Sequence, residues 1–382
     1  MEYRNSTRRM LLAPRFQNLD KLRGFAALSV LLYHVIEHTH WSAFPREGPL
    51  YWGRIGWMGV DLFFVLSGLV ITHSAWGLFH TQGARWQQIY WARRTARIVP
   101  LYCLTLGIYM TFVTPEWLSV NLVKLLWHTG THLLFIHNIF PGTHGSINGV
   151  NWSVGVEMQF YLLIALTLHW LVRAHLATLA LGSLCVAWVW RSVAFLLLQD
   201  QGTNLLFQYS TQLPGSIDEF VIGVMLCKLL VDPRYMRLLH LLECNRKIIF
   251  MFSTVCCTAM LWVYINNANY WDSWWMVAIF RSLIGLSAGS VVLSAVFCPW
   301  MGPAIISNVL DYLGKISYGI YLWHLPVILS LLRSGAQAGW SFLLTTVITT
   351  LVLASASYHL FEDLWVRHVR RNESSQIPGH SL

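Results

Sequence analysis

Long apolar stretches, separated by short polar segments, run along almost the whole chain. A helix needs ~20 predominantly apolar residues to cross a bilayer, and four longer stretches contain no Asp, Glu, Lys or Arg. They lie at 62–84, 248–271, 282–310 and 334–361. Together with the other apolar stretches they predict ten transmembrane helices, at 19–38, 58–78, 96–115, 152–172, 176–198, 213–231, 248–265, 275–298, 313–333 and 341–361. The predicted fold is all-α, a polytopic membrane bundle of about ten helices.

The basic residues predict how this bundle is oriented. With the N-terminus inside, the outer half holds only six of the 26 Lys and Arg residues: Arg46, Arg54, Lys124, Arg191, Arg281 and Arg333. Cytoplasmic segments of membrane proteins carry an excess of Lys and Arg, so both termini are predicted to be cytoplasmic. The net charge of +9, in a chain with 55% hydrophobic and 11% charged residues, then reflects topology. It does not indicate a nucleic-acid partner.

The predicted organisation is a cytoplasmic segment at 1–18, a membrane domain at 19–361 and a cytoplasmic tail at 362–382. Residues 121–140 are apolar but carry Lys124, His128, His132 and His137. A span there would put the basic loop at 232–247 outside, so we expect an external segment, either re-entrant or lying outside the membrane. No cleavable signal peptide is expected, because the first apolar stretch contains charges. The seven cysteines lack metal-binding spacing and are predicted to be buried apolar thiols.

Ionisable side chains within predicted spans are candidate functional residues, because they are costly in lipid and face the protein interior or water. Arg23 and His34 are eleven residues apart, close to three helical turns. Both therefore project from one helix face, about 16 Å apart, with Arg23 near the cytoplasmic end. The alternative is that Arg23 is a snorkelling anchor and His34 an interfacial histidine.

Three further ionisable residues lie within predicted spans. Asp61 enters the second span from outside, at the depth of His34, where it would orient an imidazole or simply cap the helix. Glu157 lies about a turn and a half below the outer surface, where a carboxylate has little structural purpose in lipid. His324 lies near mid-membrane, either as a functional group or as a packing group bonded to a neighbouring helix.

Two arginines precede the third predicted span. Arg94 and Arg97 are three residues apart and share a helix face at the cytoplasmic surface. Guanidinium groups bind phosphates through forked hydrogen bonds, although ordinary positive-inside charge is the alternative. With His34, Asp61 and Glu157 in the outer half, the pattern indicates a phosphate-rich donor held from inside and a reaction delivered outward.

Five motifs, in order, resemble those of the acyltransferase-3 family of membrane O-acyltransferases. They are Arg-x10-His (23–34), Gly-Val-Asp-Leu-Phe-Phe-Val-Leu-Ser-Gly (59–68), Arg-x-x-Arg before Ile-x-Pro (94–100), Trp-Ser-x-x-x-Glu with Gln-Phe-Tyr (152–161) and Ser-Tyr-x-x-Tyr-Leu-Trp-His-x-Pro (317–326). The resemblance covers nearly the whole chain. It implies a multi-pass enzyme of the bacterial cytoplasmic (inner) membrane that moves acetyl, less often a larger acyl group, from cytoplasmic acyl-CoA to a sugar hydroxyl.

The resemblance also implies roles for individual residues. His34 is the expected catalytic histidine and Glu157 an active-site carboxylate, and Asp61 completes the catalytic set. The residues assigned to the donor are Arg23, which is also the motif partner of the histidine, Arg94, Arg97 and His324. Many members carry a second acidic residue after the Glu, where this chain has Met158, so no carboxylate pair is expected. Nor does the chain carry the extracytoplasmic hydrolase-like domain of some members, so direct transfer, or transfer to a separate protein, is expected.

The expected chemistry is general-base catalysis. A sugar hydroxyl is a poor nucleophile at neutral pH, and histidine is the usual base. We expect His34 to take the hydroxyl proton as the hydroxyl attacks the thioester carbonyl, with Asp61 or Glu157 fixing its tautomer; a covalent acyl-histidine is the alternative. No metal and no permanently bound cofactor is required. The expected partners are acyl-CoA (acetyl-CoA), a glycan acceptor such as lipopolysaccharide, exopolysaccharide or peptidoglycan, membrane lipid, and a second copy if the chain is a homo-oligomer.

Two other classes of function compete with this reading. A transporter or flippase of a glycolipid or polysaccharide unit explains the spans and the buried charges. It does not explain cytoplasmic arginines combined with an outer group of histidine and carboxylates. A purely structural membrane subunit explains none of the buried charges.

Overall fold

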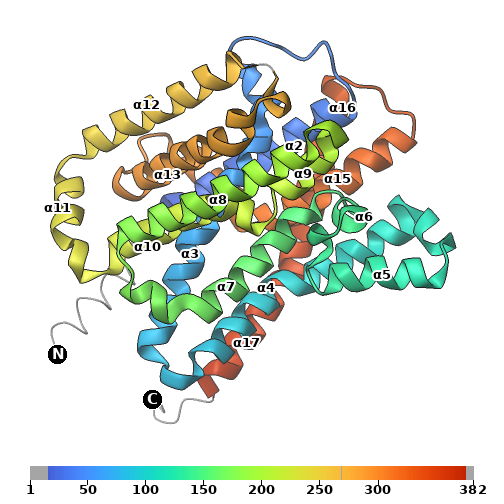
Figure 1. The fold of residues 1–382 in the computed structure, drawn as a ribbon. Helices are drawn as coiled ribbons and strands as arrows, with labels where there is room; N and C mark the ends of the chain where they lie inside the picture. Colours follow the sequence, from blue (N-terminus) through green and yellow to red (C-terminus); the bar gives the residue numbers. More distant parts are fainter. Residues whose placement is uncertain (1–15, 268, 376–382) are drawn as a thin grey trace.

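Helices make up all the regular structure of the computed structural model, which describes residues 16–267 and 269–375 (Figure 1). No β-strand occurs in those ranges, so the all-α prediction is confirmed. The helices are α2 (Gln17–His38), α3 (Gly59–Thr81), α4 (Trp86–Ile108), α5 (Leu122–Leu133), α6 (Pro141–His144), α7 (Asn151–Arg173), α8 (Leu176–Leu198), α9 (Thr203–Ser210), α10 (Leu213–Val231), α11 (Met236–Cys244), α12 (Arg246–Ile265), α13 (Arg281–Phe297), α14 (Ala304–Lys315), α15 (Ser317–Arg333), α16 (Trp340–Ser357) and α17 (Asp363–Ser375).

Seven helical units within the described residues are long and apolar enough to cross a membrane. They are Pro49–Thr81, Gly83–Val113, Asn151–Arg173, Leu176–Gln201, Arg246–Ile265, Met276–Phe297 and Trp340–Arg371. The pair α14 and α15, bent by 72°, is an eighth if it forms one span. α2 and α10 occupy the two remaining predicted spans, but each carries at least three charged residues. A multi-pass bundle is therefore confirmed, while the number ten and the cytoplasmic termini stay predictions.

Two helices extend beyond the predicted spans. α4 begins ten residues before the predicted span, so both Arg94 and Arg97 lie in the middle of a helix. Its first turns are polar and aromatic, but no Gly or Pro interrupts them. The predicted tail also begins as a helix, because α16 continues through the π-helical turn Tyr358–Glu362 into α17. Arg93 of α4 holds Glu373 of α17 in an ion pair of 2.6 Å. Residues 1–15 and 376–382 of the predicted terminal segments lie outside the described residues.

α3 lies at the centre of the bundle. Of the most apolar window of its span, 78% is buried, against 22% for α12, which lies at the edge in Figure 1. Glycines let α10 cross α3 closely: a Cβ on Gly68 would collide with the Phe220 carbonyl, and one on Gly223 with the Val65 carbonyl. Small residues at helix crossings serve this purpose in membrane proteins. The crossing holds the polar residues of α3 against those of α10.

The segment at 121–140 does not cross the bundle, as predicted. Its α5 has 12 residues, about 18 Å of helix, which is shorter than the ~30 Å hydrocarbon core. Leu122, Leu126 and Trp127 are exposed, whereas His128 and His132 are buried. Burial lowers the pKa of His132 to about 4, so this ring is neutral at pH 7. α5 is thus an amphipathic helix at the edge of the bundle (Figure 1).

Candidate active site

Two neighbouring cavities lie inside the bundle. The arginine cavity, about 80 Å³ in volume, is lined by Arg23, Arg94, Arg97 and Glu157 among others. The histidine cavity, about 650 Å³, is lined by His34, His38, His144 and Asp61 among others. Val60 and Tyr321 line both cavities. The two spaces are therefore separated by a wall no thicker than single side chains.

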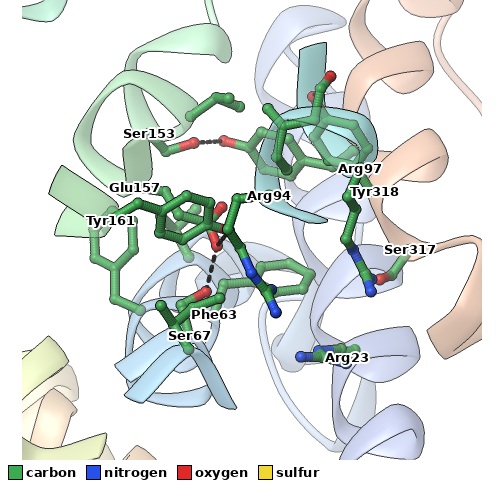
Figure 2. A pocket seen from close by; sticks show the side chains of 16 residues that line it. Arg23, Phe63, Ser67, Arg94, Arg97, Ser153, Glu157, Tyr161, Ser317 and Tyr318 are labelled. Atoms are coloured by element: carbon green, nitrogen blue, oxygen red, sulfur yellow. Dashed lines mark hydrogen bonds between the residues drawn. The ribbon is translucent and has the colours of Figure 1, made fainter. Parts of the chain in front are cut away.

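Three guanidinium groups gather in one part of the arginine cavity (Figure 2). Arg23 comes from α2, and Arg94 and Arg97 lie one turn apart on α4. The Arg23 guanidinium donates to Asp20 at 3.0 Å, and Arg94 Nη2 donates to Ser74 Oγ at 3.1 Å. Among the described residues, Arg97 has no hydrogen bond or ion pair, and the buried Arg94 Nε has no hydrogen-bond partner. The cavity thus keeps free charged donors, the groups that bind phosphates.

Glu157 lines the arginine cavity. The sequence pattern predicts a position beside His34 instead. Its Oε1 accepts hydrogen bonds from Ser67 Oγ at 2.5 Å and from Tyr161 at 2.7 Å. The physical reason is the face of α7 on which it lies. Ser153 and Glu157 are four residues apart, share one helix face and both line the arginine cavity, whereas Trp152 lines the histidine cavity. Glu157 therefore does not fix the tautomer of His34 directly.

His34 and His324 form a hydrogen-bonded pair at the wall of the histidine cavity. His34 Nδ1 lies 3.0 Å from the Val30 carbonyl and 3.1 Å from His324 Nε2. His324 is fully buried, and its Nδ1 lies 3.2 Å from the Ile320 carbonyl. A carbonyl oxygen can only accept, so Nδ1 carries the proton in both rings, and His324 Nε2 is an acceptor for the His34 N–H. His34 Nε2 is then unprotonated, and no hydrogen bond engages it within the described part of the chain.

This pairing differs from the expected role of His324. The sequence reading grouped it with the donor-binding arginines, whereas the structure places it on His34, 290 residues away in the chain. α15 begins at Ser317, directly after the 72° bend from α14, and this bend directs the helix along α2. His324 therefore lies beside His34 and not among the arginines, although it lines neither cavity itself.

Asp61 lines the histidine cavity but pairs with an arginine and not with an imidazole. Arg281 Nη2 lies 3.1 Å from Asp61 Oδ1, and Arg281 Nε donates to Glu219 at 2.8 Å. Arg191 joins the same cluster through Asp218 at 2.6 Å. All five side chains are at most 5% exposed. Neither Asp61 oxygen accepts a hydrogen bond among the described residues, so the expected orientation of the catalytic histidine by this carboxylate is not seen.

Sequence reasoning missed four members of this cluster. Asp218 and Glu219 stand together in an otherwise apolar stretch, and Arg281 separates two long uncharged windows. These were visible signals, because isolated charges in a span need a partner in the protein interior. Their partners could not be named, since the pairing depends on how α8, α10 and α13 pack around α3.

Aromatic side chains form much of the wall of the histidine cavity. Trp152 and Phe207 meet edge to face at 5.3 Å between ring centroids, and Phe207 and Trp271 at 5.9 Å. Asn204 and Gln208 of α9 supply neutral polar groups to the same wall. The same cavity is also lined by four charged residues: Glu37, Arg54, Asp61 and Arg281. An aromatic wall combined with polar and charged groups suits a ligand with flat apolar faces and a polar edge.

A metal centre is absent from the part of the chain that the structure describes, where no group of three or more His, Cys, Asp or Glu could hold an ion. The cysteines only partly follow the prediction of buried thiols: Cys227 and Cys256 are buried, but Cys103, Cys185 and Cys244 are exposed. Cys103 and Cys185 lie in candidate spans, where the surroundings are lipid. Lipid is as apolar as a protein interior, so an apolar sequence does not distinguish the two environments.

Comparison with known proteins places this geometry in context. The sequence profile of a family described as an acyltransferase domain matches residues 16–359. The chain is 28% identical to YrhL of Bacillus subtilis over 90% of its own length and 54% of that protein. It is 24% identical to the O-acetyltransferase OatA of Staphylococcus aureus, over 92% of this chain and 57% of OatA. It is also 24% identical to the peptidoglycan O-acetyltransferase OatA of Listeria monocytogenes, over 90% of this chain and 55% of that protein.

The chain thus spans about half the length of these relatives. No solved structure matches it.

Proposed function

Because this chain belongs to the acyltransferase domain family, we propose that it moves an acetyl group from cytoplasmic acyl-CoA to a sugar hydroxyl outside the membrane. One observation carries the proposal: two cavities share a single wall, with three arginines lining one and His34, which is hydrogen-bonded to His324, lining the other. Arg23 and His34 stand on the same helix, about 16 Å apart. A phosphorylated carrier held at the arginines would thus deliver its far end to the histidines.

The arginine cavity would receive the narrow end of the donor. At ~10–15 Å³ for each water, its 80 Å³ holds only a few waters. A nucleotide does not fit, so the CoA nucleotide would lie at the cavity mouth while the pantetheine arm threads inward. The spare donors of Arg94 and Arg97 would bind phosphate oxygens there. Glu157, already bonded to Ser67 and Tyr161, would hold the wall of this passage in place.

His34 Nε2 would be the general base. The sugar oxygen attacks the thioester carbonyl carbon as its proton moves to Nε2, forming the new C–O bond. The tetrahedral intermediate then collapses, the C–S bond breaks, and the thiolate takes the same proton from His34. A positioned base of this kind typically contributes ~10²–10⁴-fold. Atoms and charge balance without an added cofactor.

His324 would be a positioning residue in this reaction. It accepts the His34 Nδ1–H and so keeps Nε2 unprotonated and available. The Val30 carbonyl shares that proton at 3.0 Å, which fixes the ring plane from a second direction. This pair replaces the carboxylate–histidine arrangement that the sequence suggested.

The histidine cavity would receive the acceptor. Its 650 Å³ and its aromatic wall suit a pyranose ring, whose faces are apolar and whose edge carries hydroxyls. Peptidoglycan is the first acceptor to test, because the Listeria relative is named for it. Lipopolysaccharide and exopolysaccharide are the alternatives.

The proposed orientation follows from charge. The arginine cavity would face the cytoplasm and the histidine cavity the outside, with ten spans and both termini inside, in the bacterial inner membrane. α2 and α10 would be the two charged spans, their polar residues facing the cavities and the ion-pair cluster and not lipid.

A flippase remains the competing class of function. Such a protein needs a continuous route that is wide enough for a saccharide. The arginine cavity, at about 80 Å³, is too small to hold a saccharide. The discriminating experiment uses purified protein in lipid nanodiscs, acetyl-CoA and soluble glycan fragments. Free CoA release that depends on the acceptor, with an acetylated fragment seen by mass spectrometry, supports the proposal. Glycolipid movement without any thioester cleavage would refute it.

A further inference from the structure

The hydroxyl of Tyr321 lies where the two cavities meet. Tyr321 and Val60 are the residues that line both, and Val60 is apolar. The Tyr321 hydroxyl lies 2.6 Å from Ser153 Oγ and 3.0 Å from the Val150 carbonyl. Ser153 lines the arginine cavity and Val150 the histidine cavity. Among the shared lining side chains of the described residues, Tyr321 therefore supplies the one polar group.

Tyr321 also lies next to the histidine pair. Its ring centroid is 5.6 Å from that of His324, which in turn bonds His34 at 3.1 Å. Phe63 packs edge-on against the other side of the phenol, at 6.1 Å. The phenol is thus held between the arginine cavity and the proposed base.

The proposed reaction needs a hydrogen-bond donor at this place. When the sugar oxygen attacks, the thioester carbonyl oxygen becomes an oxyanion, and donors aimed at it lower the barrier. A thioester that enters from the arginine cavity and reacts at His34 must lie at the shared wall. Tyr321 lines both cavities, whereas Arg23, Arg94 and Arg97 line only the arginine cavity.

The hydrogen bonds around Tyr321 allow its proton to be redirected. Ser153 Oγ lies 3.2 Å from the same Val150 carbonyl that Tyr321 contacts. The two hydroxyl groups can therefore hydrogen-bond to each other, and either one can donate to the Val150 carbonyl. If the Tyr321 proton turns to a substrate oxygen, Ser153 still satisfies the Val150 carbonyl, so no buried acceptor is left without a donor.

We propose that Tyr321 is a catalytic residue whose phenol O–H donates to the thioester carbonyl oxygen and stabilises the oxyanion. This inference rests on the proposed acyl transfer. The phenol keeps its proton throughout: the hydroxyl proton of the acceptor goes to His34 Nε2 and then to the leaving thiolate. Tyr321 contributes only the hydrogen bond, which strengthens as negative charge develops on the carbonyl oxygen.

Tyr321→Phe tests this, because it keeps the ring and removes only the hydroxyl. Loss of one oxyanion donor typically lowers kcat by ~10²–10³-fold. Hydrolysis of acetyl-CoA without acceptor passes through an oxyanion at the same carbonyl, so it should fall by a similar factor. The Kd for S-ethyl-CoA, a thioether with no carbonyl, should stay within about twofold of wild type.

The matched control is Tyr90→Phe. Tyr90 is fully buried, donates to the Tyr161 carbonyl at 3.1 Å, and lines neither cavity. Tyr90→Phe should lower kcat by no more than a small factor. The melting temperatures of Tyr90→Phe and Tyr321→Phe should both lie within a few degrees of wild type. Ser153→Ala should cost less than Tyr321→Phe, because it only commits the Tyr321 proton to Val150.

Each other outcome overturns the inference. Near-normal kcat in Tyr321→Phe shows that the phenol is not the donor. Weaker S-ethyl-CoA binding with unchanged kcat assigns Tyr321 to the passage of the donor, and equal losses in Tyr90→Phe assign it to folding. A wild-type protein that neither transfers acetyl nor hydrolyses acetyl-CoA refutes the proposed function itself, which is a separate result.

Discussion

Removing Arg97 should weaken donor binding without disturbing the free protein. Arg97 lines the arginine cavity and has neither a hydrogen bond nor an ion pair within the described residues, so Arg97→Ala removes no such contact from the unliganded bundle. In the complex it would lose a charge-assisted contact to phosphate, ~1.5–3 kcal/mol. That corresponds to roughly a 10- to 150-fold higher Kd for CoA. Isothermal titration calorimetry in detergent or nanodiscs measures it directly, and adding Arg94→Ala should weaken binding further.

Arg93→Ala is the control for this prediction. Arg93 lies on the same helix and carries the same charge, but it pairs with Glu373 at 2.6 Å and does not line the cavity. It should leave the Kd for CoA unchanged while lowering the melting temperature slightly. If both variants lose the same affinity, the arginines act only through net charge. An unchanged Kd in Arg97→Ala, with the fold intact, refutes the donor site.

Three further predictions follow from other parts of the bundle. His324→Leu should lower the transfer rate roughly 5- to 10-fold, the worth of one hydrogen bond, and His324→Asn, which keeps an acceptor, should recover most of it; equal rates in the two variants would speak against the positioning role. Arg281→Met leaves buried Asp61 without its cation and Glu219 with only Arg191, at 3.7 Å, so it should destabilise the fold by about 3–5 kcal/mol, measured by thermal unfolding, and an unchanged melting temperature would contradict the cluster. Cysteines introduced at the exposed positions 46 and 142 should react with a membrane-impermeant maleimide in intact cells, whereas labelling at 237 would overturn the proposed topology.

The sequence was a good guide to which segments are helical. Long uncharged stretches predict helices at the observed places, because lipid requires the backbone to satisfy its own hydrogen bonds. It was a poor guide to where α4 begins, because the first half of that helix is polar and carries Arg93, Arg94 and Arg97. A hydropathy pattern detects the apolar part of a span and not the part that lines a polar cavity.

The pairing of side chains was beyond the sequence. His34 meets His324 across 290 residues, and Asp61 meets Arg281 in place of a histidine. Depth along a helix correctly indicated that Arg23 and His34 are well separated on α2, where they line different cavities. It did not indicate that Glu157 falls on the arginine side of the wall, because that depends on where α3 and α7 cross. The candidate residues were found, but their partners required the packed bundle.

Substitution of His34 is the most direct test of the central claim, that an unprotonated Nε2 at the histidine cavity is the general base. His34→Ala should lower acetyl transfer by ~10²–10⁴-fold while the Kd for CoA, set at the arginines, stays unchanged. His80→Ala is the matched control, because His80 Nδ1 also bonds the carbonyl four residues earlier, at 2.9 Å, but lines neither cavity. Both proteins must reach normal abundance in the membrane. A well-folded His34→Ala variant with near-normal transfer would contradict the account.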